Sequence, residues 1–410
     1  MVKKTLVFLI FFLQLNQRPA LLQEYGEPLF ILICSLLILY WLLGYRGTIT
    51  DRKVIFLFTG FVFCVYLWGQ VLLLGSASRP ALINVIFILV SSLSILYLTE
   101  ETWQAGLKAV VYPVLALSFS YFTTLLIVYS LNIPLDKLTW ASFGVSQAEN
   151  ANRYKISVYF PFSISMLLGN FRFGGFELAR AIGYMREPGI YQILVSASFF
   201  GLDYLPHLRF KTFWKALLGL SLLLTFSTAG IGAFLAAATY YYVFARKGVQ
   251  YTTNYVSILS IPLILGLGYW FVFTEAKFGL MRKLSFDSGT VRAEEAETAV
   301  AMLLDNPILG VGYTGGIKTA ISFISVIGSI GLLGVILFLV VIVTPNYQKI
   351  IKLDPILVLI IPPVLTALLA QPLFDKPVLY IFMALVVSYP GECHESDPKH
   401  HPQVFVHSKE

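Results

Sequence analysis

The chain has 410 residues, of which 57% are hydrophobic and only 12% are charged, and its formal net charge is +7. A soluble domain carries about 25% charged residues, so this composition excludes an ordinary soluble protein and predicts a polytopic membrane protein. The cysteines do not suggest a disulfide framework, because Cys34 and Cys64 lie in apolar runs and Cys393 lies in a polar tail.

Apolar runs of membrane-spanning length follow one another along the chain. The first, MVKKTLVFLIFFLQLNQRPALL, resembles a signal peptide but lacks a small-residue cleavage site, so we interpret it as a retained helix. A helix needs roughly 20 residues to cross the hydrocarbon core, and on this measure the sequence predicts an all-α fold with twelve spans. The expected spans are 5–21, 28–45, 54–75, 80–99, 109–131, 188–205, 212–227, 229–245, 254–273, 318–343, 354–371 and 377–390.

Basic residues are distributed unevenly between the short loops on the two sides of the predicted membrane. One side holds eleven, namely Arg46, Arg52, Lys53, Lys108, Arg209, Lys211, Lys215, Arg246, Lys247, Lys349 and Lys352. The other side holds only Arg18, Arg79 and Lys376. Because Lys and Arg in short loops stay in the cytoplasm, we expect both termini there. Residues 1–390 then form one membrane domain with long external loops at 132–187 and 274–317, followed by a polar cytoplasmic tail at 391–410.

The first external loop contains an apolar stretch, ISVYFPFSISMLLG, that is too short to span a membrane and is interrupted by proline. We expect it to form a re-entrant or interfacial segment. The loop ends in RAIGYMREPG, in which Pro188 suits the first position of a helix. Glu187 should therefore lie at a helix N-terminus, where its negative charge is favoured and its strength as a base is reduced.

The second external loop contains a short amphipathic helix, because apolar residues recur at helical spacing from Ala296 to Leu304 and the pattern stops at Asn306-Pro307. Arg292 precedes this helix, as Arg180 and Arg186 precede the span at 188–205. Guanidinium groups fork onto phosphate oxygens, so these three arginines predict an external site for a lipid-linked phosphate or diphosphate. The alternative is that they only reach lipid headgroups or solubilise the loops.

Four segments together resemble the O-antigen polymerase and O-antigen ligase superfamily. RAIGYMREPG followed by an apolar span is similar to its first external signature, and DSGTVRAEEAETAVAMLLDNPILGVGYTGG, with an Arg before a helix that ends in NPxLGxG, to its second. LLLTFSTAGIGAFLAAATYYYVFARK resembles its Ser-centred turn between two helices, and GSIGLLGVILFL its Gly-rich late helix. The spacing from Arg172 to Gly183 adds a weaker match.

The resemblance implies a metal-independent, inverting glycosyltransferase of GT-C architecture that needs no cofactor. Its substrates would be undecaprenyl-diphosphate-linked oligosaccharides at the outer face of the bacterial inner membrane. A chain-length regulator and a flippase are the partners it implies besides the lipid bilayer, and no nucleic acid is expected. Both external loops lack an Asp-x-Asp pair and histidine, in keeping with a metal-independent reaction.

Candidate site residues follow from the two signatures. Arg180 and Arg292, helped by Arg172 and Arg186, would bind the diphosphate, and Glu187 would organise these arginines or act as the base. Aromatic side chains are expected either to line a sugar groove or to anchor the membrane interface; they are Tyr184, Tyr191, Trp140 and Phe173. Gly310 and Gly312 would let the backbone approach the substrate, or would serve only as turn glycines.

The stretch after the NPxLGxG turn separates a polymerase from a ligase. Ligases of this superfamily resemble one another in a histidine at this place, whereas the sequence here is GYTGGIKTAISF, with Lys318 and Thr319. We therefore expect a polymerase of lipid-linked repeat units for O-antigen, capsule or exopolysaccharide. The alternatives are a ligase that transfers glycan to a lipid or protein acceptor, and a flippase for the same lipid-linked units.

Overall fold

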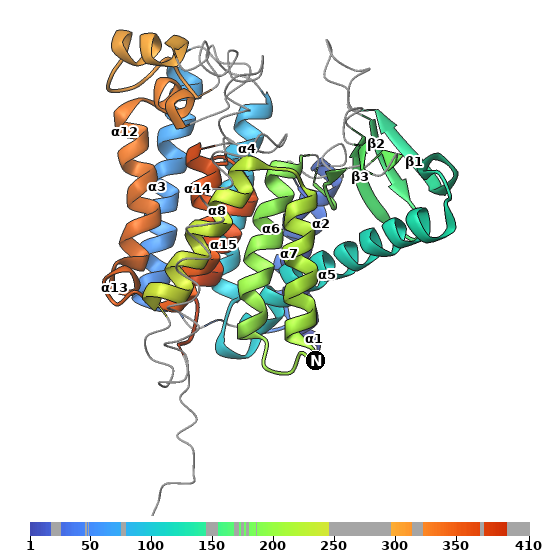
Figure 1. The fold of residues 1–410 in the computed structure, drawn as a ribbon. Coiled ribbons are helices and arrows are strands. Elements are labelled where there is room, and N and C mark those ends of the chain that lie inside the picture. Colours follow the sequence, from blue (N-terminus) through green and yellow to red (C-terminus); the bar gives the residue numbers. More distant parts are fainter. Residues whose placement is uncertain are drawn as a thin grey trace, which may run out of the picture.

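A computed structural model describes residues 1–17, 26–45, 47, 49–74, 79–144, 155–167, 172–173, 176–177, 180–185, 187–245, 297–313, 323–369 and 373–391. Most of these residues form helices that run between two ends of a bundle, and a small β-sheet lies beside one end (Figure 1). The bundle is thus mostly helical, as the composition predicts, although it is not all-α.

The N-terminal part contains five helices, at the places where the first five spans are expected. They are α1 (Val2–Leu15), α2 (Gly26–Leu42), α3 (Asp51–Leu73), α4 (Arg79–Leu93) and α5 (Glu100–Leu131). A 3-10 turn, Ser94–Tyr97, extends α4. α5 begins well before its predicted start because Thr99 and Thr102 form a reciprocal capping box at its N-terminus.

Besides a short helix at 297–305, the C-terminal part of the described chain adds seven helices. They are α6 (Pro188–Gly201), α7 (Lys211–Leu224), α8 (Thr228–Thr239), α12 (Phe323–Val343), α13 (Tyr347–Ile351), α14 (Ile361–Leu369) and α15 (Pro377–Val387). The span expected at 254–273 lies outside the described residues. Within the described part, three helices are long and apolar enough to cross a membrane: Asp51–Leu73, Glu100–Leu131 and Val326–Ile351. These three helices are compatible with a membrane protein, and twelve spans stay a prediction.

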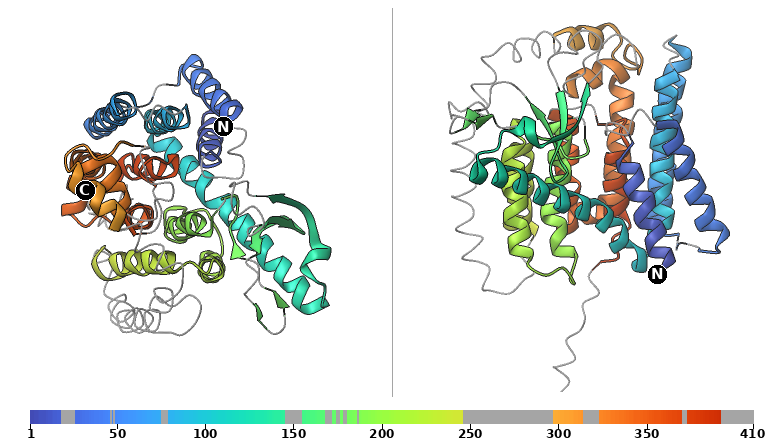
Figure 2. Two further views of the ribbon diagram at one scale, coloured as in Figure 1. Left: turned by 90° about the horizontal axis from the view of Figure 1, so that it is seen from above. Right: turned by 90° about the vertical axis from the view of Figure 1, so that its right-hand side faces the viewer.

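The helices alternate in direction, so the two sets of predicted loops lie at opposite ends of the bundle. The start of α1, the α6–α7 connection and the segment around α13 lie at the lower end of Figure 1. The start of α6, the α7–α8 turn and residues 297–313 lie at the upper end. The side view in Figure 2 shows the same separation, with the sheet near the upper end. The lower end carries the short loops that are rich in Lys and Arg.

The apolar stretch in the first long loop forms a β-hairpin rather than the re-entrant segment expected from the sequence. Strands β2 (Lys155–Tyr159) and β3 (Ser163–Leu167) are its two arms. A four-stranded antiparallel sheet, in the order β1-β2-β3-β6, includes them with β1 (Thr139–Gly144) and β6 (Arg180–Ala181). A separate two-stranded hairpin pairs β4 (Arg172–Phe173) with β5 (Phe176–Glu177).

Serines explain why this stretch is a hairpin packed on α5. Serine alternates with apolar residues in ISVYFPFSISM, which is the period of a strand. The hydroxyl of Ser163 lies 2.8 Å from that of Thr124, and the hydroxyl of Ser120 accepts a 3.0 Å hydrogen bond from the backbone of Phe162. Hydroxyl groups thus hold the turn of the hairpin against α5. Its second strand, β3, pairs with β6, which precedes α6.

The two most enclosed helices are α6 and α15. Every side chain of α15 is buried, as is nearly every one of α6. α1 packs along α5 and also contacts α2 and α15, whereas α14 packs on both α6 and α8. The ends of α6 and α15 are therefore fixed relative to the rest of the bundle, and both begin at its upper end (Figure 1).

Candidate functional site

Arg180 joins the RAIGYMREPG segment to the turn between α7 and α8. It lies in β6, opposite Met166 of β3. Its Nε donates to the carbonyl oxygen of Thr225 at 2.8 Å, and its Nη2 donates to that of Phe226 at 2.9 Å. The last carbonyls of a helix have no partner within the helix, and a guanidinium group satisfies them and offsets their partial negative charge. Arg180 thus stabilises the C-terminal end of α7 and ties it to the sheet.

The α7–α8 turn is the Ser-centred motif predicted from the sequence. Phe226 has a positive φ of 48°, and Ser227 is the N-cap residue of α8. At Gly230, in the first turn of α8, a Cβ atom would lie 0.9 Å from Oε1 of Gln192. The glycine therefore makes room for the Gln192 side chain of α6, and α6 and α8 approach closely at this point.

Gln192 is a buried amide whose hydrogen-bonding groups have no partner. The residue is 1% exposed, and neither its Oε1 nor its Nε2 makes a hydrogen bond. Leaving a buried polar group unsatisfied costs about 1–3 kcal/mol, and such groups in native proteins are often associated with function. Sequence reasoning missed this residue because a single glutamine in an apolar span carries no pattern.

Glu187 occupies the position predicted for it, although its side chain does not cap the helix. It is the N-cap residue of α6, with Pro188 in the first turn. Its backbone oxygen accepts hydrogen bonds from Ile190 and Tyr191, whereas its carboxylate makes no capping hydrogen bond. The predicted role in orienting arginines is untested, because Arg186 lies outside the described residues.

Two of the four aromatic candidates for a sugar groove are buried, and the side chain of Phe173 lies outside the described residues. Tyr184 is 6% exposed, and its ring packs edge-on against Phe12 of α1 at 6.4 Å. Tyr191 is also buried, and a Cβ at Gly183, which has a φ of 53°, would lie 2.2 Å from its ring. These two tyrosines hold the RAIGYMREPG turn in the core and offer no open stacking surface. Trp140, at 66% exposure, does offer one, and its ring lies 5.9 Å from that of Phe160.

The helix predicted in the second loop is present at 297–305 and ends where Asn306-Pro307 begins. Of its apolar positions, Ala299 is buried against α12, and Val300 and Leu304 are exposed. The next residues form a tight turn, in which the Gly310 amide donates to the carbonyl of Asn306 at 2.8 Å. The NPxLGxG motif is therefore a helix end followed by a turn.

This turn bonds to α12, which is broken at Gly331, where φ is 66° and ψ is 177°. Amides of the turn donate to carbonyls of Gly328 and Ser329, and amides beyond the break donate back to carbonyls of Pro307 and Ile308. Tyr66 and Gln70 of α3 complete the unit by donating at 2.5 Å to the carbonyls of Ile330 and Leu309, respectively. The Gly-rich late helix and the NPxLGxG turn thus form one hydrogen-bonded unit.

The glycines of this turn are accounted for by the turn itself. Gly310 and Gly312 have φ values of 70° and 106°. A Cβ at Gly310 would lie 2.4 Å from the backbone oxygen of Ser329. Gly310 therefore permits a close approach to α12, and Gly312 takes a backbone conformation that favours glycine.

A buried carboxylate, which sequence reasoning missed, lies next to this unit. Asp375 immediately precedes Lys376, the N-cap residue of α15, and is 7% exposed. Its Oδ2 accepts hydrogen bonds from the Tyr313 hydroxyl at 2.7 Å, from Lys376 Nζ at 2.9 Å and from Asn84 Nδ2 at 3.3 Å. Its Oδ1 is buried without a partner. The sequence does offer one signal for it, because Asp375 is the only acidic residue between positions 355 and 391.

The remaining predicted residues are placed only in part. Arg186 and Arg292 lie outside the described residues. Arg172 pairs with Glu177 in the β4–β5 hairpin, and only its backbone is described. Among the residues that the structure describes, no three His, Cys, Asp or Glu side chains are grouped so as to hold a metal ion.

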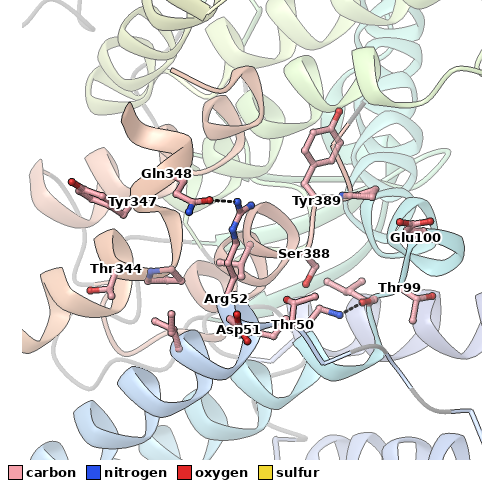
Figure 3. Close-up of a pocket in the computed structure, with 16 residues that line it drawn as sticks. Thr50, Asp51, Arg52, Thr99, Glu100, Thr344, Tyr347, Gln348, Ser388 and Tyr389 are labelled. Atoms are coloured by element: carbon pink, nitrogen blue, oxygen red, sulfur yellow. Dashed lines mark hydrogen bonds between the residues drawn. The ribbon is translucent and has the colours of Figure 1, made fainter. Parts of the chain in front are cut away.

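A pocket of about 680 Å³ lies at the opposite, lower end of the bundle. The starts of α3 and α5, the start of α13 and the end of α15 form its walls (Figure 3). Arg52 donates to Gln348 Oε1 at 2.5 Å across it, and Lys53 donates to the carbonyl of Leu98. Asp51 and Glu100 also line the pocket. The pocket is on the predicted cytoplasmic side, away from both signatures.

These features define a mostly helical protein, in whose described part three helices are long and apolar enough to be compatible with a membrane protein and both sequence signatures lie toward one end. No family model, curated protein or solved structure matches the chain. The roles proposed below therefore rest on the residues and contacts described above.

Proposed function

We propose that this protein polymerises undecaprenyl-diphosphate-linked oligosaccharide repeat units at the outer face of the bacterial inner membrane. The observation that supports this proposal is the pairing of the sequence signatures. Arg180 of the first signature bonds the Ser-centred turn at Thr225 and Phe226. The NPxLGxG turn bonds the Gly-rich helix at Gly328 and Ser329. Segments far apart in sequence thus meet in pairs at one end of the bundle.

In this proposal the enzyme is an inverting glycosyltransferase with twelve spans, GT-C architecture and both termini in the cytoplasm. A growing glycan binds through its diphosphate to Arg180 and Arg292, aided by Arg172 and Arg186. A hydroxyl of an incoming lipid-linked unit attacks the anomeric carbon of the growing chain. The carbon–oxygen bond to the diphosphate breaks, and undecaprenyl diphosphate leaves with the electron pair. Arginine donors fixed in place offset the charge that develops on the leaving group.

The contacts of Arg180 fit such a role. A guanidinium group has five N–H donors in a rigid plane, and two of them are engaged by the backbone carbonyls of the α7–α8 turn. These two bonds fix the plane of the group. A fixed planar fork binds a diphosphate at little entropic cost, because the side chain is ordered before the substrate arrives.

A flippase for the same lipid-linked units is the second candidate, and two observations favour it. α12 is broken at Gly331, and Asp375 is a buried ionisable group near the start of α15. Transporters use broken helices and buried ionisable residues at their substrate and ion sites. Both features, however, lie at the same end as the two signatures, as expected for a site of transfer chemistry on one face.

A deletion strain of the producing bacterium tests the proposal. Loss of long polymer with retention of glycans of a single repeat unit is expected for a polymerase. Accumulation of lipid-linked units that face the cytoplasm would instead indicate the flippase. Restoration of the length ladder by the plasmid-borne gene is the control that assigns the effect to this protein.

A further inference from the structure

The two oxygens of the Asp375 carboxylate have different surroundings. Three donors from three parts of the chain converge on Oδ2: Asn84 of α4, Tyr313 after the NPxLGxG turn, and the neighbouring Lys376. Oδ1 is equally buried but accepts no hydrogen bond. The carboxylate is therefore held firmly by one oxygen, and the other oxygen retains its full capacity to accept a proton or a hydrogen bond.

A purely structural carboxylate is not expected to be arranged in this way. A buried charged group is normally satisfied on all its polar atoms, since leaving one unsatisfied costs more than the 1–3 kcal/mol typical of neutral groups. Asp375 has three donors nearby, and all of them bond the same oxygen. Unsatisfied groups of this kind in native proteins often mark catalytic or ligand-binding positions.

Tyr313 keeps the arrangement in place over a wide pH range. Burial, and then the negative charge of Asp375, raise the pKa of Tyr313 well above its ordinary value. Its hydroxyl therefore stays protonated and donates to Oδ2. Among the described residues, the charged and titratable groups facing Asp375 are Lys376, Tyr313 and, from within α15, Tyr380, and Lys376 forms an ion pair with the carboxylate.

The cluster is linked to the proposed site through the NPxLGxG turn and through packed helices. Tyr313 follows Gly312, whose amide bonds Ser329 of α12, so the second signature positions the tyrosine. α14, which leads to Asp375, packs on α6 and α8, the helices that carry the first signature and the Ser-centred turn. The start of α6, the turn before α8 and the NPxLGxG turn all lie toward the upper end of the bundle (Figure 1).

We infer that Asp375 is the general base of the proposed transfer, an inference that rests on the proposed function. Oδ1 accepts the proton of the attacking hydroxyl as that oxygen forms its bond to the anomeric carbon. The bond from this carbon to the diphosphate oxygen breaks, and undecaprenyl diphosphate departs with the electron pair. The proton then passes from Asp375 to solvent, which restores the carboxylate. Tyr313, Asn84 and Lys376 are positioning residues that act through Oδ2.

The test uses the full chain, reconstituted in lipid nanodiscs, with undecaprenyl-diphosphate-linked repeat units as the substrate. Asp375→Asn keeps the size of the side chain and the donors around Oδ2 but removes the base. General-base catalysis contributes roughly 10²- to 10⁴-fold, so kcat should fall by about that factor. KM for the lipid-linked unit and the midpoint of thermal unfolding should stay near the wild-type values. Tyr313→Phe should lower kcat by a smaller factor, because it removes one positioning donor.

Asp305→Asn is the matched control, since Asp305 is an exposed carboxylate that ends helix 297–305 at the same end of the molecule. Near-normal kcat in Asp375→Asn, or a loss explained by KM or by unfolding, would overturn the inference while leaving the proposed function intact. Absence of polymer from the wild-type protein would overturn both. If Asp375→Asn does not insert, Asp375→Glu replaces it: a carboxylate displaced by one methylene should lower kcat, and an unchanged kcat would refute the role.

Discussion

Arg180 is the residue at which structure and proposed chemistry are most closely linked. Its guanidinium bonds two carbonyls that end α7, which is a stabilising contact in its own right. The same contact ties β6 to the turn before α8, whose first helical turn packs at Gly230 against the unsatisfied amide of Gln192 in α6. A single substitution therefore distinguishes a residue that only anchors the loop from one that also binds diphosphate.

Arg180→Lys should shorten or eliminate the polymer at matched expression. Lysine keeps the charge but replaces the planar fork with a point charge. Hydrogen bonds to charged groups contribute roughly 1.5–3 kcal/mol, which corresponds to about a 10- to 150-fold lower rate if one is lost in the transition state. Chain-length ladders and membrane protein levels measure the outcome, with Lys137→Ala in the same loop as the control. Normal ladders from Arg180→Lys would show that the arginine only anchors the turn.

At the scale of elements, the break in α12 and the NPxLGxG turn stabilise each other. The turn contributes amides and carbonyls that the broken helix can no longer supply to itself, and Tyr66 and Gln70 bond two further carbonyls. Unpaired backbone groups are especially costly where water is excluded. The two elements are therefore expected to be stable only together.

Gly310→Ala tests this mutual dependence. The left-handed backbone at Gly310 alone disfavours alanine by about 1–3 kcal/mol, and the new Cβ would lie 2.4 Å from the backbone oxygen of Ser329. A lower midpoint of thermal unfolding is expected in detergent. Gly219→Ala in α7 is the control, because no atom lies within 4 Å of the Cβ position there. Equal stability of the two variants would contradict the proposed coupling.

At the scale of the whole molecule, the bundle has two chemically different ends. The lower end carries the basic short loops and the pocket with Arg52 and Lys53, and the upper end carries both signatures and the sheet (Figures 1 and 3). In the proposed function, the lipid-linked substrate is exported before polymerisation and therefore reaches only one of these ends. The orientation of the chain in the membrane is therefore decisive for the proposed function.

Labelling of intact cells with a membrane-impermeant thiol reagent measures that orientation. In a variant without native cysteines, Trp140→Cys on β1 should be labelled from outside, and His207→Cys in the α6–α7 connection should be labelled only after lysis. Both positions are exposed, so accessibility does not depend on burial. Labelling of position 207 in intact cells would place the signatures in the cytoplasm and contradict the proposed function.

The sequence by itself determined the helical framework. Within lipid, backbone groups must be satisfied inside the segment, so an apolar run of sufficient length implies a helix wherever it packs. Helices accordingly occur at the expected places on both sides of the undescribed span at 254–273, with α6 beginning at Pro188 and helix 297–305 ending at Asn306-Pro307. The positions and ends of these helices depend on residues that are close to one another in the sequence.

Only the tertiary structure decided the roles of individual side chains. The hairpin at 155–167 needed α5 and β6 as partners, and the burial of Tyr184 depended on Phe12 of α1. Asp375 contacts Tyr313, 62 positions away, and Asn84, 291 positions away. No local pattern encodes such separations, because the contacts arise only when packing of the apolar helices brings these residues to the same end of the bundle.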